Sequence, residues 1–242
     1  MPSPLVAISK RALDIASSLA GLALCAPLFP ILAVAIKLDS PGPVLFAQER
    51  ANGLETDPAS PLGFRCRTFT LYKLRTMCDQ AEAKTGAVLA SRNDPRVTRV
   101  GRFLRKTRLD ELPQLVNVLK GDMSLVGPRP ERPELLVDLA AAIPFFEERV
   151  RGVKPGLTGP AQVSLRYTGA IPQDNPLWRF RESLQNPFGL DEAEGALADD
   201  MRAKLLYDMA YCGALERFGT FLHMELWVIL TTPLVMIRKL GE

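Results

Sequence analysis

The strongest constraint in the sequence is an apolar run near its start. No charged residue lies between Ile15 and Ile36, and Asp14 and Lys37 bound the run. As a straight helix, positions 15 to 36 would extend about 33 Å, which is enough to cross the hydrocarbon layer of a membrane. The run therefore predicts that the chain is anchored in a membrane.

Two features of the run bear on its shape. Pro27 and Pro30 lie inside it, and each removes a helical hydrogen bond and favours a kink. Basic residues flank both ends, with Lys10 and Arg11 before the run and Lys37 after it. Because basic flanks prefer the cytoplasmic side, a bent helix that enters and leaves by one face satisfies both. An ordinary single-pass anchor is the alternative, and the residues alone leave the two open.

The rest of the chain has the composition of a mixed globular domain. Of the 242 residues of the whole chain 24% are charged, and the net charge is +3, which excludes a disordered tail and a polytopic membrane protein. His223 is the only histidine, so a catalytic triad or a His-rich zinc site would have to rest on it alone. The four cysteines show no metal-ligand spacing, which indicates reduced thiols. The chemistry must rely mainly on carboxylates, arginine and lysine.

Hydrophobic periodicity after the turn at Asp39–Pro43 predicts short strands and helices, and hence an α+β fold. Strands are expected at 44–50 and 69–77, with a loop at 51–67 between them. Helices are expected at about 78–91, 97–107, 111–119 and 191–211, and an irregular stretch at 169–189. The last apolar segment, 215–240, is expected to lie in the membrane interface as a helix.

Asp110 and Glu111 lie at the start of one predicted helix. Pro113 fits a helix only in its first turn, which sets the start near Asp110. There the helix dipole and Arg108 are expected to lower the pKa of a carboxylate and keep it ionised. An ionised aspartate can attack phosphorus, and two adjacent carboxylates can hold Mg²⁺. The simpler alternative is an Asp N-cap with an acidic first turn, and the residues alone favour it by about two to one.

Several cations are arranged in ways that suit phosphate. Arg129 stands between two prolines that restrict its backbone, so its guanidinium is presented with little freedom for bidentate binding. Lys73 and Arg75 fall on one face of a predicted strand. A further basic helix face suits anionic lipid head groups better than nucleic acid, because no aromatic side chains interleave with Arg99, Arg102, Arg105 and Lys106.

The ordered set of motifs resembles the bacterial sugar transferases, the monotopic phosphoglycosyl transferases. The resemblance runs from Lys10 to about Tyr211. It rests on KRALD at 10–14, DSPGPV at 39–44 with QER at 48–50, KLRTM at 73–77, DPRVTRVG at 94–101, LDELPQL at 109–115, GDMSLVGPRP at 121–130 and KPGLTG at 154–159. Any one of these is modest evidence, and all of them in this order are highly specific.

The resemblance implies a re-entrant membrane helix over residues 1–39, broken at Ser40–Pro41, and a small catalytic domain over 40–242 with interfacial amphipathic helices. It implies a bacterial inner-membrane protein whose catalytic domain lies on the cytoplasmic face. The implied partners are a UDP-sugar donor, polyprenol (undecaprenyl) phosphate as the acceptor and membrane lipids, with no nucleic acid. Whether the protein forms a homodimer stays open.

The implied reaction is a ping-pong transfer of sugar 1-phosphate to the lipid, as the first membrane step of glycan or exopolysaccharide assembly. By the resemblance, Asp110 would attack the donor's β-phosphate and release UMP, and Glu111 would assist, with Mg²⁺ held at this pair. The remaining implied substrate- and phosphate-binding residues are Arg129, Lys73, Arg75, Arg108 and Asp208. The alternative is a catalytically inactive scaffold or lipid-phosphate-binding partner of the same fold.

Three parts of the chain depart from the family pattern. The loop expected at 51–67 is longer than usual. The stretch 169–206 is interpreted as a variable insertion that could shape sugar specificity. Beyond Tyr211 the family usually has an aspartate, and Glu225 is the nearest equivalent here, so no role is assigned to it.

Overall fold

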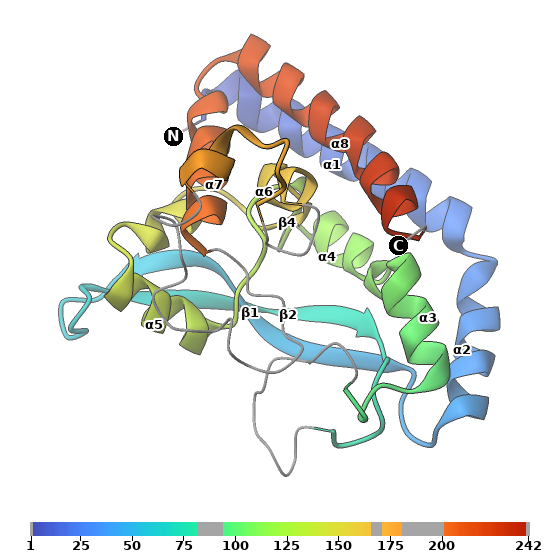
Figure 1. Cartoon of the computed structure of the whole chain (residues 1–242). Helices are drawn as coiled ribbons and strands as arrows, with labels where there is room; N and C mark the ends of the chain where they lie inside the picture. The colour runs from blue at the N-terminus through green and yellow to red at the C-terminus, as the bar shows by residue number, and fades with distance from the viewer. Residues whose placement is uncertain (1, 82–93, 166–170, 181–200, 241–242) are drawn as a thin grey trace.

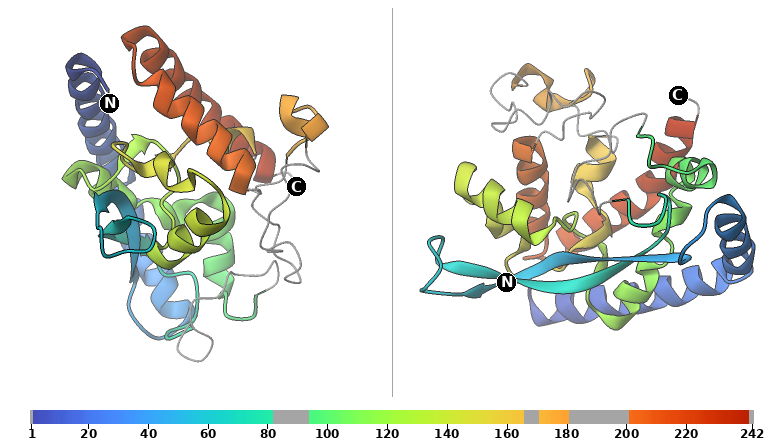
Figure 2. Two further views of the ribbon diagram at one scale, coloured as in Figure 1. Left: turned by 90° about the vertical axis from the view of Figure 1, so that its left-hand side faces the viewer. Right: turned by 90° about the horizontal axis from the view of Figure 1, so that it is seen from below.

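The computed structural model describes residues 2–81, 94–165, 171–180 and 201–240. A long β hairpin forms one side of the domain, and helices cross the other side (Figure 1). Helix α4 (Gln114–Lys120) packs against both the hairpin and α1 (Pro4–Cys25). Helix α8 (Phe218–Leu240) contacts the first half of α1 and then diverges from it (Figure 2). Three more helices complete this part of the chain: α5 (Pro133–Ala142), α6 (Pro160–Ser164) and α7 (Met201–Ala214). Two 3-10 turns lie at Phe146–Val150 and Pro176–Phe180.

The N-terminal apolar run forms two helices rather than one. Helix α1 is followed by α2 (Leu28–Asp39), and the two are bent by 61°. The bend lies at Pro27, which has no N–H to continue α1, whereas Pro30 sits in the first turn of α2, where a missing N–H costs nothing. The break implied at Ser40–Pro41 is therefore wrong, because Ser40 caps the end of α2 by donating its N–H to the Ile36 carbonyl.

Of the described helices, α8 alone is long and apolar enough to cross a membrane, over Phe218–Ile237. Helices α1 and α2 pass the same test only when they are taken together as a bent pair. A bend of this size is compatible with a broken span or with a re-entrant loop.

The β hairpin is longer than the sequence predicts. Strands β1 (Leu45–Thr56) and β2 (Phe64–Leu74) pair antiparallel along most of the stretch that was expected to be a loop. A register shift between Ala51 and Gly53 leaves Asn52 without a partner in the ladder as a β-bulge, and pairing then continues to Thr56 and Phe64. The prolines of this stretch fall in the connecting turn, which is why a composition-based prediction of a longer loop fails.

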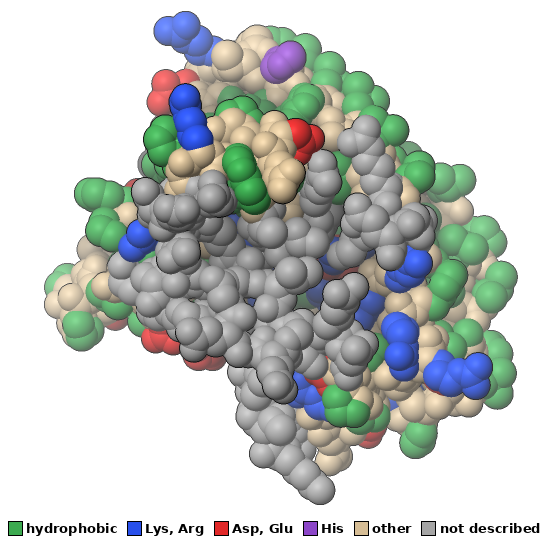
Figure 3. Space-filling view, in the orientation of Figure 1, with side chains coloured by type: hydrophobic (Ala, Val, Ile, Leu, Met, Phe, Trp, Pro, Cys, Tyr) green, Lys and Arg blue, Asp and Glu red, His purple; other side chains and the backbone are tan. Residues whose placement is uncertain are grey.

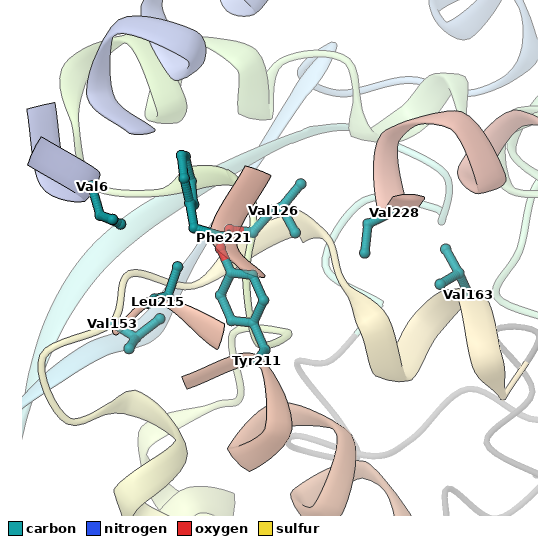
Figure 4. Packing of buried hydrophobic residues seen from close by; sticks show 8 residues of the cluster. All are labelled: Val6, Val126, Val153, Val163, Tyr211, Leu215, Phe221 and Val228. Carbon is teal, nitrogen blue, oxygen red and sulfur yellow. Dashed lines mark hydrogen bonds between the residues drawn. The ribbon is translucent and has the colours of Figure 1, made fainter. Parts of the chain in front are cut away.

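A second, smaller sheet lies near the centre of the domain. Strands β3 (Ser124–Val126) and β4 (Gly156–Thr158) pair in parallel. Beside them a hydrophobic cluster combines residues of α1, β3, α7 and α8, including Val6, Val126, Tyr211 and Phe221 (Figure 4). The start of α1 is thus part of the core of the domain.

The predicted helices are confirmed in part. Helix α3 (Arg99–Thr107) and α4 match the expected helices at 97–107 and 111–119 to within a few residues. Helix α7 covers the second half of the expected helix at 191–211, whose first ten residues lie outside the described part. The helix expected at 78–91 falls mostly outside it too, and Cys78–Ala81 are not helical.

Candidate active site

The acidic pair lies in a short connection between two helices. Helix α3 ends at Thr107, and Arg108 then adopts a left-handed conformation with φ of 59°. Asp110 and Glu111 form a 3-10 turn, Leu109–Glu111, and α4 starts only after Pro113. Both carboxylates are buried, with 6% and 7% of their residues' surface exposed. The tight turn therefore directs two adjacent acids into the protein.

Three cations from separate segments converge on Glu111. Its Oε1 lies 3.0 Å from Lys73 Nζ, 3.6 Å from Arg108 Nη1 and 3.8 Å from Arg129 Nη2. Burial acts to raise the pKa of Glu111, but the charges of Lys73, Arg129 and Arg108 outweigh it and lower the pKa to about 2. Glu111 is therefore ionised, and it holds together the three cations that the sequence assigned to phosphate binding.

Asp110 differs electrostatically from its neighbour. Its Oδ1 is buried without a hydrogen-bond partner. Burial, together with the charge of Glu111, raises the pKa of Asp110 to about 6, although Lys73, Arg108 and Arg105 oppose this shift. The expectation of a lowered pKa for Asp110 was wrong, because the carboxylate is desolvated beside a second carboxylate rather than exposed at a helix end.

This shift gives a stability prediction for Asp110→Asn. A carboxyl whose pKa rises from 3.8 to about 6 on folding destabilises the fold fully above pH 6, and this penalty disappears as the pH falls towards 4. The variant is expected to be about 2–3 kcal/mol more stable than wild type at pH 8 and nearly equal at pH 4. Denaturant unfolding in detergent at both pH values measures this, and a less stable variant at pH 8 would contradict it.

Buried contacts hold the backbone of Arg129 in place. Arg149 Nη2 lies 3.3 Å from the Arg129 carbonyl oxygen, and Arg50 Nη1 donates to the Pro130 carbonyl at 3.2 Å. Arg149 is completely buried and pairs with Asp208 at 2.6 Å and with Glu131 at 3.3 Å. The Arg129 side chain keeps 33% of its surface exposed. The guanidinium of Arg129 is thus presented from a rigid loop, as its flanking prolines predict.

Two residues implied as ligands lie elsewhere. Asp208 is fully buried and forms its ion pair with Arg149, so it supports the Arg129 loop from behind. Arg75 follows the end of β2 and donates to the carbonyls of Ser40 and Pro41, so it fixes the turn after α2. Strand alternation placed Arg75 beside Lys73, but the strand ends between them, at Leu74.

Sequence reasoning missed several buried polar residues. Arg149 and Glu131 carried no motif signal that set them apart from surface charges. Glu225, to which no role was assigned, is buried and accepts hydrogen bonds from Lys10 at 2.7 Å and from Tyr211 at 2.6 Å. Its matching position in the family pattern was the signal that could have found it.

The acidic pair can be tested for its fit to a metal ion. Within the described residues, no group of three or more His, Cys, Asp or Glu side chains could hold one. The pair therefore supplies at most two carboxylates, and Asp110 Oδ1 has no partner. Mg²⁺ keeps several waters and binds commonly through one or two carboxylates and substrate phosphates, so this donor set fits it.

A buried acidic pair that faces a cluster of cations is typical of a site for phosphate chemistry. The chain belongs to the bacterial sugar transferase family, whose sequence model it matches over residues 5–239.

Three curated relatives are similar over about two thirds of this chain. A UDP-N-acetylgalactosamine-undecaprenyl-phosphate N-acetylgalactosaminephosphotransferase of Aeromonas hydrophila is 47% identical over 69% of this chain and 36% of its own length. A UDP-glucose:undecaprenyl-phosphate glucose-1-phosphate transferase of Caulobacter vibrioides is 48% identical over 67% and 57%. The exopolysaccharide production protein PSS of Rhizobium leguminosarum is 42% identical over 64% and 74%. The chain thus spans only about a third of the first relative.

Proposed function

We propose that this protein transfers a sugar 1-phosphate from a UDP-sugar to undecaprenyl phosphate, as a step of glycan or exopolysaccharide assembly. Membership of the sugar transferase family and the names of the relatives support the reaction class. The observation that carries the proposal for the mechanism is the buried, unpartnered oxygen of Asp110 beside a carboxylate that three cations hold.

In the first half-reaction, an oxygen of ionised Asp110 attacks the β-phosphorus of the UDP-sugar. The bond from this phosphorus to the bridging oxygen breaks, and UMP leaves with the electron pair. The phosphosugar is then held on Asp110 as an acyl phosphate. Lys73, Arg108 and Arg129 neutralise the charge on the phosphoryl oxygens, which is the main requirement of phosphoryl transfer.

In the second half-reaction, a phosphate oxygen of the lipid attacks the same phosphorus. The bond between phosphorus and the Asp110 oxygen breaks, the carboxylate is restored, and a polyprenyl diphosphosugar forms. Asp110 and Glu111 are the residues that would hold Mg²⁺ with the phosphates. When bound, Mg²⁺ supplies charge neutralisation and orientation of the phosphates.

The donor is water-soluble and the acceptor lies in lipid, so the site must lie where the two meet. Exposed apolar side chains of α2 and α8 follow one edge of the molecule, among them Ile31, Val34, Leu230 and Leu234 (Figure 3). On α3, Arg99, Arg102 and Lys106 are exposed. We infer that α1 and α2 form a re-entrant anchor, that α8 lies in the interface, and that the domain faces the cytoplasm of the bacterial inner membrane.

Cysteine labelling tests this topology. In a variant without the native cysteines, single cysteines at Ser3 and Ser60 flank the bent pair, one before α1 and one in the turn of the hairpin. A re-entrant anchor puts both on the cytoplasmic side, so both are expected to react only with a reagent that reaches that side. Labelling of the two positions from opposite sides would establish a spanning anchor instead.

The function itself is tested by incubating the purified protein with Mg²⁺, undecaprenyl phosphate and a panel of UDP-sugars while UMP release is measured. At least one sugar is expected to give UMP and a lipid-linked product in equal amounts. Binding of the lipid phosphate with no UMP from any sugar would support an inactive scaffold. The sugar that reacts identifies the donor.

A further inference from the structure

The charged residues at the start of α1 bind the domain instead of facing solvent. Lys10 Nζ donates to the Val126 carbonyl at 2.9 Å and to Glu225 at 2.7 Å. One turn of helix further on, Asp14 Oδ1 accepts hydrogen bonds from the Ser124 hydroxyl at 2.9 Å and from the Leu125 N–H at 2.8 Å. A basic flank that served only to orient the anchor would need none of these contacts.

Arg11 caps the helix that follows the acidic pair. Its Nη1 and Nη2 donate to the carbonyls of Val118 and Leu119, each at 2.7 Å. The last carbonyls of a helix lack the usual i+4 partner, and the guanidinium fork binds two of them at once, although the Val118 carbonyl also accepts from the Gly121 N–H at 3.0 Å. Val118 and Leu119 lie only four and five residues after Gln114, so this contact is about 6–8 Å along the helix axis from the start of α4, which follows the acidic pair.

Close packing adds a second contact between the same two helices. A Cβ on Gly21 of α1 would lie 3.0 Å from Leu115 Cδ1, so α1 and α4 approach closely at this point. Leu115 is buried and lies four residues after Glu111. The Arg11 hydrogen bonds fix the position of α4 along its axis, and the contact of Gly21 with Leu115 fixes its distance from α1.

Asp14 fixes the other side of the site. Only 3% of its surface is exposed, and its carboxylate holds both the side chain of Ser124 and the backbone of Leu125 in β3. Strand β3 leads directly through Gly127 and Pro128 to Arg129. One face of α1 therefore holds the segment that carries the acidic pair and the segment that carries Arg129.

We propose that Arg11 and Asp14 are positioning residues of the site. They hold α4 and β3 at a fixed separation on α1, and thereby set the distance between Asp110–Glu111 and Arg129. This inference rests on the proposed function. It assigns to the first half of the anchor a role in the geometry of the reaction in addition to attachment to the membrane.

The test uses substitutions that separate hydrogen-bond geometry from charge. Arg11→Lys keeps the charge but loses the fork, and Asp14→Asn keeps an acceptor oxygen but loses the charge, whereas Asp14→Ala loses both. Lys37→Gln is the matched control, because Lys37 is a basic flank of the same anchor and is exposed. For each variant, the kcat and KM of UMP release are measured with the UDP-sugar, together with the membrane-bound fraction.

The proposal predicts at least a tenfold loss of kcat/KM, with a raised donor KM, for Arg11→Lys and Asp14→Ala. Asp14→Asn and Lys37→Gln are expected to stay within twofold of wild type, and all variants to remain membrane-bound. An Arg11→Lys variant with wild-type kcat/KM would overturn the proposal. If Arg11→Lys does not fold, the comparison of Asp14→Ala with Asp14→Asn decides. Equal kcat/KM values for these two variants would overturn the proposal. An inactive wild type would instead refute the proposed function.

Discussion

Replacing Asp110 with Asn is expected to reduce UMP release by at least about 10³-fold. The amide keeps the size and the buried position of the carboxylate, but it has no anionic oxygen with which to attack phosphorus. Since the substitution also removes a buried charge with a raised pKa, the inactive variant should be more stable than wild type near neutral pH. Loss of activity without loss of stability separates a role in the reaction from a role in folding.

The matched control is Asp138→Asn, an exposed aspartate on α5. It carries the same chemical change away from the acidic pair and is expected to keep wild-type activity. UMP release measured with equal amounts of folded protein compares the two variants. Near-normal turnover by the Asp110 variant would mean that another group forms the bond to phosphorus.

Replacing Arg149 with Leu is expected to lower the free energy of unfolding by about 3–5 kcal/mol at pH 7. Arg149 is completely buried and pairs with Asp208 and Glu131, so its loss removes the ion pair of Asp208 and one of the cations around Glu131. The effect should shrink in acid, because burial raises the pKa of Asp208 even with Arg149 present, and its carboxyl can then be protonated. Denaturant unfolding of wild type and variant at pH 7 and pH 5 measures the loss of stability and its decrease in acid.

Arg151→Leu is the control for this prediction. Arg151 forms a 2.8 Å ion pair with Glu148, but its side chain is 49% exposed, and exposed pairs of this kind contribute little. A change of no more than about 0.5 kcal/mol is expected. Equal losses of stability in the two variants would show that the burial of Arg149 has no special importance.

The sequence was most informative where a local rule decides the outcome. The bend of the anchor follows from Pro27, which lacks the N–H that would continue the helix. The presentation of Arg129 follows from its two flanking prolines. The acidic pair and its cations were recognisable because the motifs that carry them occur in a fixed order.

Predictions failed where the outcome depends on contacts between distant segments. The pKa of Asp110 depends on burial and on the charge of Glu111, neither of which a helix-end argument includes. Asp208 forms a buried ion pair with Arg149, 59 residues earlier in the chain, a partner that no local pattern indicates. The sequence indicates Arg11 only as a flank of the anchor, yet its partners are the carbonyls of a helix more than 100 residues away.

The most direct test of the central claim is the mass of the reacted site peptide. Enzyme is mixed with Mg²⁺ and the reactive UDP-sugar without lipid acceptor, quenched and digested with trypsin, which releases residues 109–120 as one peptide because no Lys or Arg lies between Arg108 and Lys120. The account predicts that this peptide gains the mass of the phosphosugar and that fragmentation assigns it to Asp110. An adduct on Glu111 or elsewhere, or no adduct while UMP is released, would contradict it.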